Sequence, residues 1–170
     1  MRKIAIAAAA LLCLPAIAEA RVNFRAKLTG YQEVPSVNTA AEGTFEAAFD
    51  DGGISYTLTY ARLQATVQQA HIHFAQPAVN GSIVVWLCGT ATNPGPAGTP
   101  ACPPGGGRVS GLITPAKVLA SSTASQQFPA GNLEALVDAM LAGAAYANVH
   151  TAASPGGEIR GQIFGAGHFR

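Results

Sequence analysis

The stretch Phe45–Tyr60, "FEAAFDDGGISYTLTY", decides the fold class of this chain. Apolar residues recur at alternate positions of its first half as far as Phe49, and large apolar and hydroxyl-bearing residues alternate from Ile54 onward. A period of two puts successive side chains on opposite faces of a β-strand. The intervening residues 50–53, "DDGG", supply a turn. The stretch therefore predicts an antiparallel β-hairpin with one apolar face.

The same alternation recurs along the chain, between segments rich in glycine and proline. It is present in residues 22–28 and around "AHIHF" (Ala70–Phe74), whereas "SIVVWLC" (Ser82–Cys88) is apolar on both faces, which is typical of a central strand. Two further strands are expected at Tyr146–Thr151 and Glu158–Phe164. Short strands separated by turn residues predict an all-β fold, an antiparallel Greek-key β-sandwich or barrel.

One segment, "NLEALVDAMLAGAA", departs from this pattern. Its large apolar residues fall at helical spacing: Leu133, Leu136, Val137, Met140 and Leu141. Asn132 is suited to cap the start of a helix, and Gly143 stands just past its end. The segment predicts a single short α-helix that covers an open end or edge of the sheet.

Residues 1–20 have the features of a signal peptide. Two basic residues precede an almost wholly apolar run, Ile4–Ile17, and Ala18–Ala20 offers the small-x-small pattern that a signal peptidase accepts. The apolar run is short for a transmembrane span, and no second run follows. We expect cleavage after Ala20, a secreted or periplasmic protein with no membrane span after processing, and one domain over residues 21–170.

Export leaves Cys88 and Cys102 as the two cysteines of the mature chain. An even pair in an oxidising compartment is most simply a disulfide. The bond would close the loop "CGTATNPGPAGTPAC", whose glycine, proline and threonine content gives little apolar surface to bury. A thiolate metal site would need closer cysteine spacing.

The charge of the chain excludes some partners. The net charge is +1 and only 11% of the residues are charged, so the basic surface of a nucleic-acid-binding protein is absent. The sequence contains no block of like charges and names no protein partner.

Three of the four histidines share a predicted orientation. His71 and His73 alternate with Ala70, Ile72 and Phe74, so the two imidazoles point away from the apolar face of their strand. In "AYANVHT", His150 lies opposite to the apolar set Ala145, Ala147 and Val149 and on the same face as Tyr146 and Asn148. All three histidines are therefore expected outside the apolar core, on an outer face or in a cleft covered by loops.

This orientation permits a metal site. Two histidines at i and i+2 place their imidazoles side by side, and a third from a neighbouring strand would complete a three-nitrogen site suited to copper or zinc. Copper is favoured by its place in the affinity order. The alternative is that His71 and His73 lie on a solvated face or hydrogen-bond to loops. His168, in the tail "GAGHFR", is expected to be solvated.

Five segments resemble the CHRD domain, the module repeated in chordin and found singly in exported bacterial proteins. These are "LTGYQEVPSV" (Leu28–Val37), "GTFEAAFD" (Gly43–Asp50), "SYTLTYARL" (Ser55–Leu63), "AHIHFAQPAVNGSIVVWL" (Ala70–Leu87) and "YANVHTAASPGGEIRGQI" (Tyr146–Ile163). They span nearly the whole of the mature chain in the family's order. The resemblance implies an exported domain but no settled biochemical role.

A fainter similarity concerns the copper-zinc superoxide dismutases, which are Greek-key barrels. "HIH" and "NVH" are similar to their copper-binding segments, and this implies His71, His73 and His150 as ligands of one copper ion. Arg160 is the one candidate for an anion-attracting cation. The chain has neither the bridging histidine nor the zinc loop of those enzymes, so the similarity implies copper alone.

Three functions are therefore open: a metal-binding module, a copper-only dismutase-like enzyme, and a structural or protein-binding module without metal.

Other residues are expected to have structural roles. Glu33 is expected to cap backbone amides in a turn, Glu158 and Arg160 to form a surface ion pair, and Trp86 to lie in the core or on a sheet face.

Overall fold

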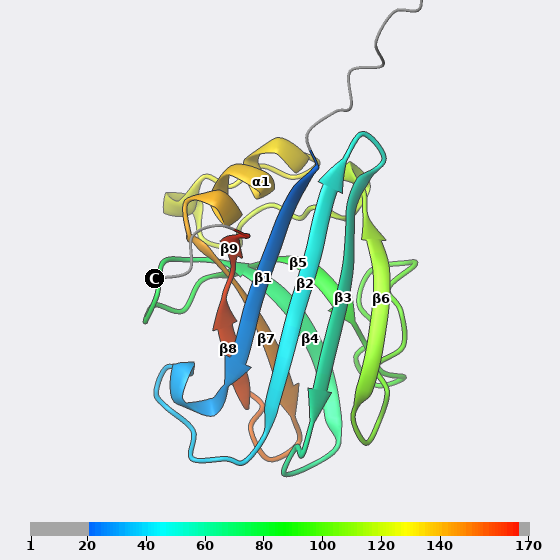
Figure 1. Ribbon diagram of the computed structural model, residues 1–170, viewed down its shortest axis with the longest axis vertical. Helices are drawn as coiled ribbons and strands as arrows, with labels where there is room; N and C mark the ends of the chain where they lie inside the picture. The colour runs from blue at the N-terminus through cyan, green and yellow to red at the C-terminus, as the bar shows by residue number, and fades with distance from the viewer. Residues whose placement is uncertain (1–20, 167–170) are drawn as a thin grey trace, which may run out of the picture.

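The computed structural model describes residues 21–166, which form one strongly curved antiparallel sheet with one α-helix (Figure 1). The predicted signal peptide at residues 1–20 and His168 lie outside the described residues. The strands are β1 (Val22–Thr29), β2 (Glu42–Asp50), β3 (Gly53–Ala61), β4 (Val67–Phe74), β5 (Ser82–Cys88), β6 (Gly107–Ile113), β7 (Ala145–Thr151), β8 (Ile159–Gln162) and β9 (Phe164–Gly165). The predicted all-β class with one short helix is confirmed.

The strands follow the order β5-β4-β7-β8-β1-β2-β3-β6, with β9 paired to β1. The chain crosses from β3 to β4 and from β6 to β7, so strands adjacent in sequence are not always neighbours in the sheet. The two end strands, β5 and β6, contact each other, and the sheet curls into a nearly closed barrel. Its interior is filled by large side chains such as Phe45, Leu58 and Ile72, none of which is exposed to solvent.

The hairpin predicted from Phe45–Tyr60 is confirmed. β2 and β3 pair in continuous register from Glu42 opposite Ala61 to Asp50 opposite Gly53. The Asp50 carboxylate accepts a hydrogen bond from the Gly52 amide at 3.1 Å, which closes the turn.

The prediction that Ser82–Cys88 is a central strand is wrong. β5 pairs only with β4 and stands at one end of the ladder. Its free edge is covered by the segment that follows β6, because the Leu119 amide donates to the Val84 carbonyl at 2.8 Å. Gln126 also accepts from the Ser82 amide at 3.2 Å. A loop can therefore cover the free edge of a strand that has only one strand neighbour.

Strand β6 was not predicted, because its sequence "GRVSGLI" has two glycines and little apolar alternation. Gly111 lies opposite Tyr56 in the β3–β6 ladder, and a β-carbon there would come within 2.7 Å of the Tyr56 ring. The glycine makes room for this ring, whose hydroxyl donates to the Leu87 carbonyl of β5 at 2.6 Å. The residue that weakens the strand signal is thus required by packing across the barrel.

Helix α1 (Leu133–Leu141) confirms the helix prediction and lies across one end of the barrel (Figure 1). The Asn132 side chain accepts a hydrogen bond from the Ala135 amide at 2.9 Å, as expected of an N-cap. Leu136 and Met140 are fully buried over the barrel end. Gly143 adopts a φ of 65°, the left-handed conformation that ends helices.

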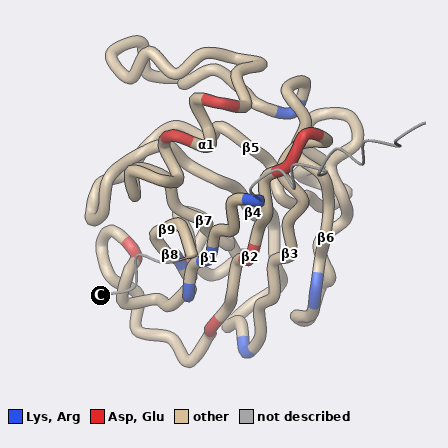
Figure 2. Tube along the Cα trace, turned by 45° about the horizontal axis from the view of Figure 1, so that its top comes forward, with Lys and Arg blue, Asp and Glu red and all other residues tan. Residues whose placement is uncertain are grey.

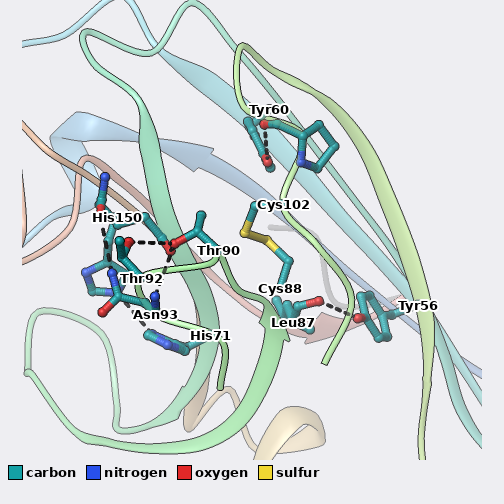
Figure 3. The surroundings of a disulfide bond; sticks show 12 residues. Tyr56, Tyr60, His71, Leu87, Cys88, Thr90, Thr92, Asn93, Cys102 and His150 are labelled. Atoms are coloured by element: carbon teal, nitrogen blue, oxygen red, sulfur yellow. Dashed lines mark hydrogen bonds between the residues drawn. A yellow bond between two sulfur atoms is a disulfide. The ribbon is translucent and has the colours of Figure 1, made fainter. Parts of the chain in front are cut away.

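Cys88 and Cys102 form a disulfide that joins the end of β5 to the far end of the loop (Figure 3). Next to the bond, the Cys102 amide donates to the Gly89 carbonyl at 2.8 Å. The Tyr60 hydroxyl donates to the Pro103 carbonyl at 2.8 Å, which ties the segment between Cys102 and β6 to strand β3.

Replacing both cysteines by alanine is expected to lower the free energy of unfolding by about 3 kcal/mol, because a closed loop of this size restricts the unfolded chain by that amount. Urea denaturation of the oxidised wild type and of the Cys88→Ala/Cys102→Ala variant measures the difference. Equal midpoints and equal slopes would show that the loop is held by its hydrogen bonds alone.

Charged residues are scattered over the described chain without a large patch of one sign (Figure 2). Among residues 21–166, no helix has the length and apolar character needed to cross a membrane.

Candidate metal centre

The three predicted histidines come together on neighbouring strands. β4 carries His71 and His73, and the adjacent antiparallel strand β7 carries His150, which is paired with Gln69. Their side chains lie on the face opposite to Ala70, Ile72 and Val149, as the period of two predicts. The face is not solvated: His71, His73 and His150 are exposed by only 0%, 8% and 6%. Of the two predicted settings, the structure has the covered one.

The spacing of the ring nitrogens suits a single ion. Nδ1 of His71 lies 3.2 Å from Nε2 of His150, and one ligand nitrogen from each of the three rings lies within 4.8 Å of the others. Metal–nitrogen bonds near 2.0–2.1 Å with trigonal or tetrahedral angles place ligand nitrogens about 3.3–3.6 Å apart. The two nitrogens of the His71–His150 pair are slightly closer than this and are joined by a hydrogen bond without the metal. The His73 nitrogen lies within 4.8 Å of them and would have to move closer to share the ion.

Backbone carbonyls fix which nitrogen two of the rings present. Nδ1 of His73 donates to the Gly81 carbonyl at 2.9 Å, and Nδ1 of His150 donates to the Pro155 carbonyl at 3.0 Å. A carbonyl oxygen only accepts, so Nδ1 carries the proton in both rings and Nε2 keeps its lone pair. Metal-binding histidines are oriented in this way by a partner on the other ring nitrogen.

The protein keeps the three rings neutral. Burial, together with the neighbouring His150 and His73, lowers the pKa of His71 to about 2. Burial likewise lowers the pKa of His73 to about 4, against the opposing effect of its Gly81 hydrogen bond. The pKa of His150 is also lowered by burial. Neutral imidazole is the form that binds a metal ion.

Two of the ring nitrogens have no hydrogen-bond partner among the described residues. These are Nε2 of His71 and Nε2 of His73, and both are buried. A buried polar atom without a partner costs about 1–3 kcal/mol. A metal ion bound by His71, His73 and His150 (the triad) would account for the unpaired nitrogen of His73, which faces away from the carbonyl that holds the other ring nitrogen.

Tyr146 and Arg160 form a stack on one side of the triad. The Tyr146 ring lies parallel to that of His73, with centroids 4.7 Å apart and an interplanar angle of 4°. The Arg160 guanidinium lies over the Tyr146 ring, with its Cζ atom 3.3 Å from the ring centroid. Gly81 links Tyr146 to His73, because its amide donates to the Tyr146 hydroxyl at 3.3 Å and its carbonyl accepts from the His73 ring.

The prediction of a surface ion pair between Glu158 and Arg160 is wrong. Their side chains are exposed by 0% and 1% and have separate partners. Glu158 accepts from Thr39 at 2.8 Å and from Thr151 at 2.7 Å. Arg160 donates to Asn80 and to the carbonyls of residues 76 and 79. Both face the side of the sheet that loops cover, so two polar residues at alternate positions are buried here.

Arg160 therefore lies near the triad but behind Tyr146, with hydrogen bonds to the loop that precedes β5. Its role as an anion-attracting residue stays a prediction.

Trp86 contacts the triad from β5. Its ring lies edge-on to His71, with centroids 4.3 Å apart, and the side chain is half-buried. A β-carbon on Gly95 would come within 2.6 Å of the indole, so the backbone of the disulfide loop lies directly against this ring. The expected sheet-face position of Trp86 is confirmed, and the structure adds its contact with a candidate ligand.

Glu33 joins the same covered layer. It is 7% exposed and accepts a hydrogen bond from the Asn148 side chain at 2.5 Å. Burial raises the pKa of Glu33 to about 7, although Asn148 and Arg160 act in the opposite direction. Glu33 has the expected hydrogen bond to backbone, with Val34 in its turn. It also binds Asn148 of β7, which lies opposite His71 in the β4–β7 ladder.

Sequence reasoning predicted the shared orientation of the three histidines but missed the residues that hold them. The alternation of side chains along a strand could have found Tyr146, because it puts this residue on the same face as His150. The roles of Gly81, Pro155 and Trp86 have no signal in the sequence, because they depend on loops that fold over the sheet.

Comparison with known proteins gives one match. The model of the CHRD domain family matches residues 24–163, which is most of the chain. No curated protein and no solved structure matches.

Proposed function

The chain belongs to the CHRD domain family, and we propose that it is an exported β-sandwich binding module that holds one copper ion between His71, His73 and His150. The observation that carries this proposal is the convergence of three buried, neutral imidazoles from two strands, two of them oriented by backbone carbonyls. Histidines that served only to hydrogen-bond loops would not need one nitrogen from each ring within 4.8 Å of the others.

Copper is the metal that these donors favour. Imidazole binds copper and zinc, and copper precedes zinc in the affinity order of divalent ions. The group of three contains no thiolate and no carboxylate, which leaves out the ligands preferred by clustered iron and by calcium or magnesium. A three-nitrogen set supplies the coordination of a mononuclear ion.

Export is supported by the disulfide, since such bonds persist in oxidising compartments. The proposal includes removal of residues 1–20, so that the mature chain begins at Arg21. N-terminal sequencing of the protein recovered from the periplasm or the medium tests this part.

Copper binding is expected at one ion per chain in the wild type, and His150→Ala is expected to abolish it or weaken it severely. Isothermal titration with copper and metal analysis after dialysis measure both. The chain has one tryptophan, Trp86, and its contact with His71 makes its fluorescence a built-in reporter that copper should quench. His168→Ala is the matched control, because the sequence places that histidine outside the ligand set.

If the wild type and the variant lacking all three histidines bind copper equally poorly, the proposal is wrong. The histidines then serve to hydrogen-bond loops, and the module is structural or binds protein. Zinc titrated in the same way, alone and in competition with copper, shows whether the preference for copper holds.

A further inference from the structure

The candidate copper centre is closed by the protein. Gly81 and Pro155 hold the outer sides of His73 and His150, and the stack of Tyr146 and Arg160 covers a further side. The unpaired Nε2 atoms of His71 and His73 are buried. The three imidazoles are exposed by 8% or less, which leaves little surface through which a substrate could reach an ion between them.

Two aromatic side chains of the described chain contact the triad, and they differ in exposure. Tyr146 is only 2% exposed and lies beneath Arg160. Trp86 is half-buried, so its indole joins His71 on the inside to the surface on the outside. Electron transfer between donor and acceptor needs electronic coupling but no bond, and an indole in contact with a candidate ligand imidazole shortens the path from that ligand to the surface.

The loop that packs against Trp86 is uncharged. The adjoining loop 89–101, "GTATNPGPAGTPA", contains no acidic or basic residue, and its Gly95 packs against the indole. A partner that approaches Trp86 is therefore not selected by charge, and its rate of reaction should depend little on salt.

We propose that the copper centre exchanges single electrons with a redox partner at the surface through Trp86, and that it does not bind substrate at the ion. This inference rests on the copper site proposed above. In the oxidising direction, Cu(I) loses one electron, which passes through His71 and Trp86 to a one-electron acceptor, and Cu(II) remains. No bond to the copper forms or breaks with the partner, and no proton is required.

The rate of this transfer is measured by mixing Cu(I)-loaded protein with hexacyanoferrate(III), which becomes hexacyanoferrate(II) as Cu(II) appears in the EPR spectrum. Trp86→Leu is expected to slow the reaction markedly, because it removes the aromatic contact between His71 and the surface. Trp86→Phe keeps an aromatic ring and should restore much of the rate. Tyr31→Leu, which removes an aromatic ring that is 70% exposed, is the control and should leave it unchanged.

A second measurement uses the wild type alone and so does not depend on any variant folding. Azide binds directly to Cu(II) that has an open position and changes its EPR spectrum. Azide is expected to leave the spectrum of the Cu(II)-loaded protein unchanged. A changed spectrum, or an oxidation rate that Trp86→Leu does not alter, would overturn the inference.

The two proposals fail in different ways. If the wild type binds no copper, the proposed function fails before any rate is measured. If it binds one copper that azide reaches, the site is open and direct chemistry at the ion, such as dismutation with Arg160 as the attracting cation, replaces electron transfer.

Discussion

Gly81→Ala is expected to destabilise the protein by about 3 kcal/mol or more, at the upper end of the range for overpacking a core. A β-carbon at this position would lie 2.0 Å from the carbonyl oxygen of Phe74 and 2.8 Å from the β-carbon of Ala75. The first contact is with backbone, so the clash cannot be relieved by rotation of a side chain. The last turn before β5 must move.

The same substitution is expected to weaken copper binding roughly 10–100-fold. The Gly81 carbonyl accepts from Nδ1 of His73, and its amide donates to the hydroxyl of Tyr146, which stacks on the same imidazole. A displaced Gly81 therefore releases His73 from two constraints at once. Copper titration of the variant, below its thermal transition, measures this effect separately from stability.

Gly105→Ala is the matched control for both measurements. It makes the same chemical change in an exposed turn where a β-carbon would meet nothing within 4 Å. Its free energy of unfolding should stay within about 0.5 kcal/mol of the wild type, and its copper affinity should be unchanged. Equal stabilities of the two variants in urea denaturation would show that the 75–81 loop yields without cost and does not position His73.

Acidification is expected to destabilise the metal-free protein. The pKa values of His71 and His73, about 2 and 4 in the folded protein because of burial, lie below the unfolded value of 6.5. The folded rings stay neutral while the unfolded ones take up protons, so stability is present above pH 6.5 and is lost as the pH falls below it. Between pH 6.5 and pH 5 each of these two rings contributes a loss of roughly 2 kcal/mol. The lowered pKa of His150 adds to it in the same direction.

Glu33 opposes this loss. Its pKa of about 7 in the folded protein, raised by burial from 4.5, means that the folded state takes up a proton before the unfolded state does. Between pH 7 and pH 5 this stabilises the folded state by roughly 2 kcal/mol. The net loss over the same interval is therefore roughly 2 kcal/mol plus the contribution of His150. The neighbouring Tyr146 stays neutral throughout, because burial raises its pKa.

Urea denaturation of the metal-free protein from pH 7 to pH 5 measures the net effect. Glu33→Gln should steepen the loss of stability with falling pH, and a variant with His71 and His73 replaced by glutamine should flatten it. A wild type whose stability rises steadily as the pH falls to 5 would contradict the assignment of neutral, buried histidines. Bound copper should protect the protein in this range, because a ligand that binds only the folded state stabilises it.

Much of the fold could be predicted from local residue order. The turn of the β2–β3 hairpin, the cap of α1 by Asn132 and the disulfide between Cys88 and Cys102 each depend on residues close together in sequence or on a simple count. The candidate site could be predicted to the same degree. The period of two put His71, His73 and His150 on one face because the side chains of a strand alternate whatever it packs against.

The failures share one physical cause. The apolar character of Ser82–Cys88 indicates burial on both faces, but not that a loop rather than a second strand covers one edge. The sequence predicted Glu158 and Arg160 to be a solvated pair, yet the loops that fold over β7 and β8 bury both and supply a hydrogen bond to each, from Thr39 to Glu158 and to Val79 from Arg160. In both cases the local sequence pattern does not show whether a loop covers the strand, because the covering loop comes from residues distant in sequence.

Residue order alone predicted most of the strands, the helix, the shared face of the three histidines and the residue types able to bind a metal, because each follows from the geometry of a single element. Strand β6 is the exception, because its glycines serve packing across the barrel. The tertiary structure decided that β4 and β7 are neighbours, which brings the imidazole nitrogens of His71 and His150 to 3.2 Å. It also decided that the histidine face is buried, since only the packing of loops carrying Gly81 and Pro155 removes that face from water. Whether these histidines face solvent or a closed centre is a long-range property of the chain.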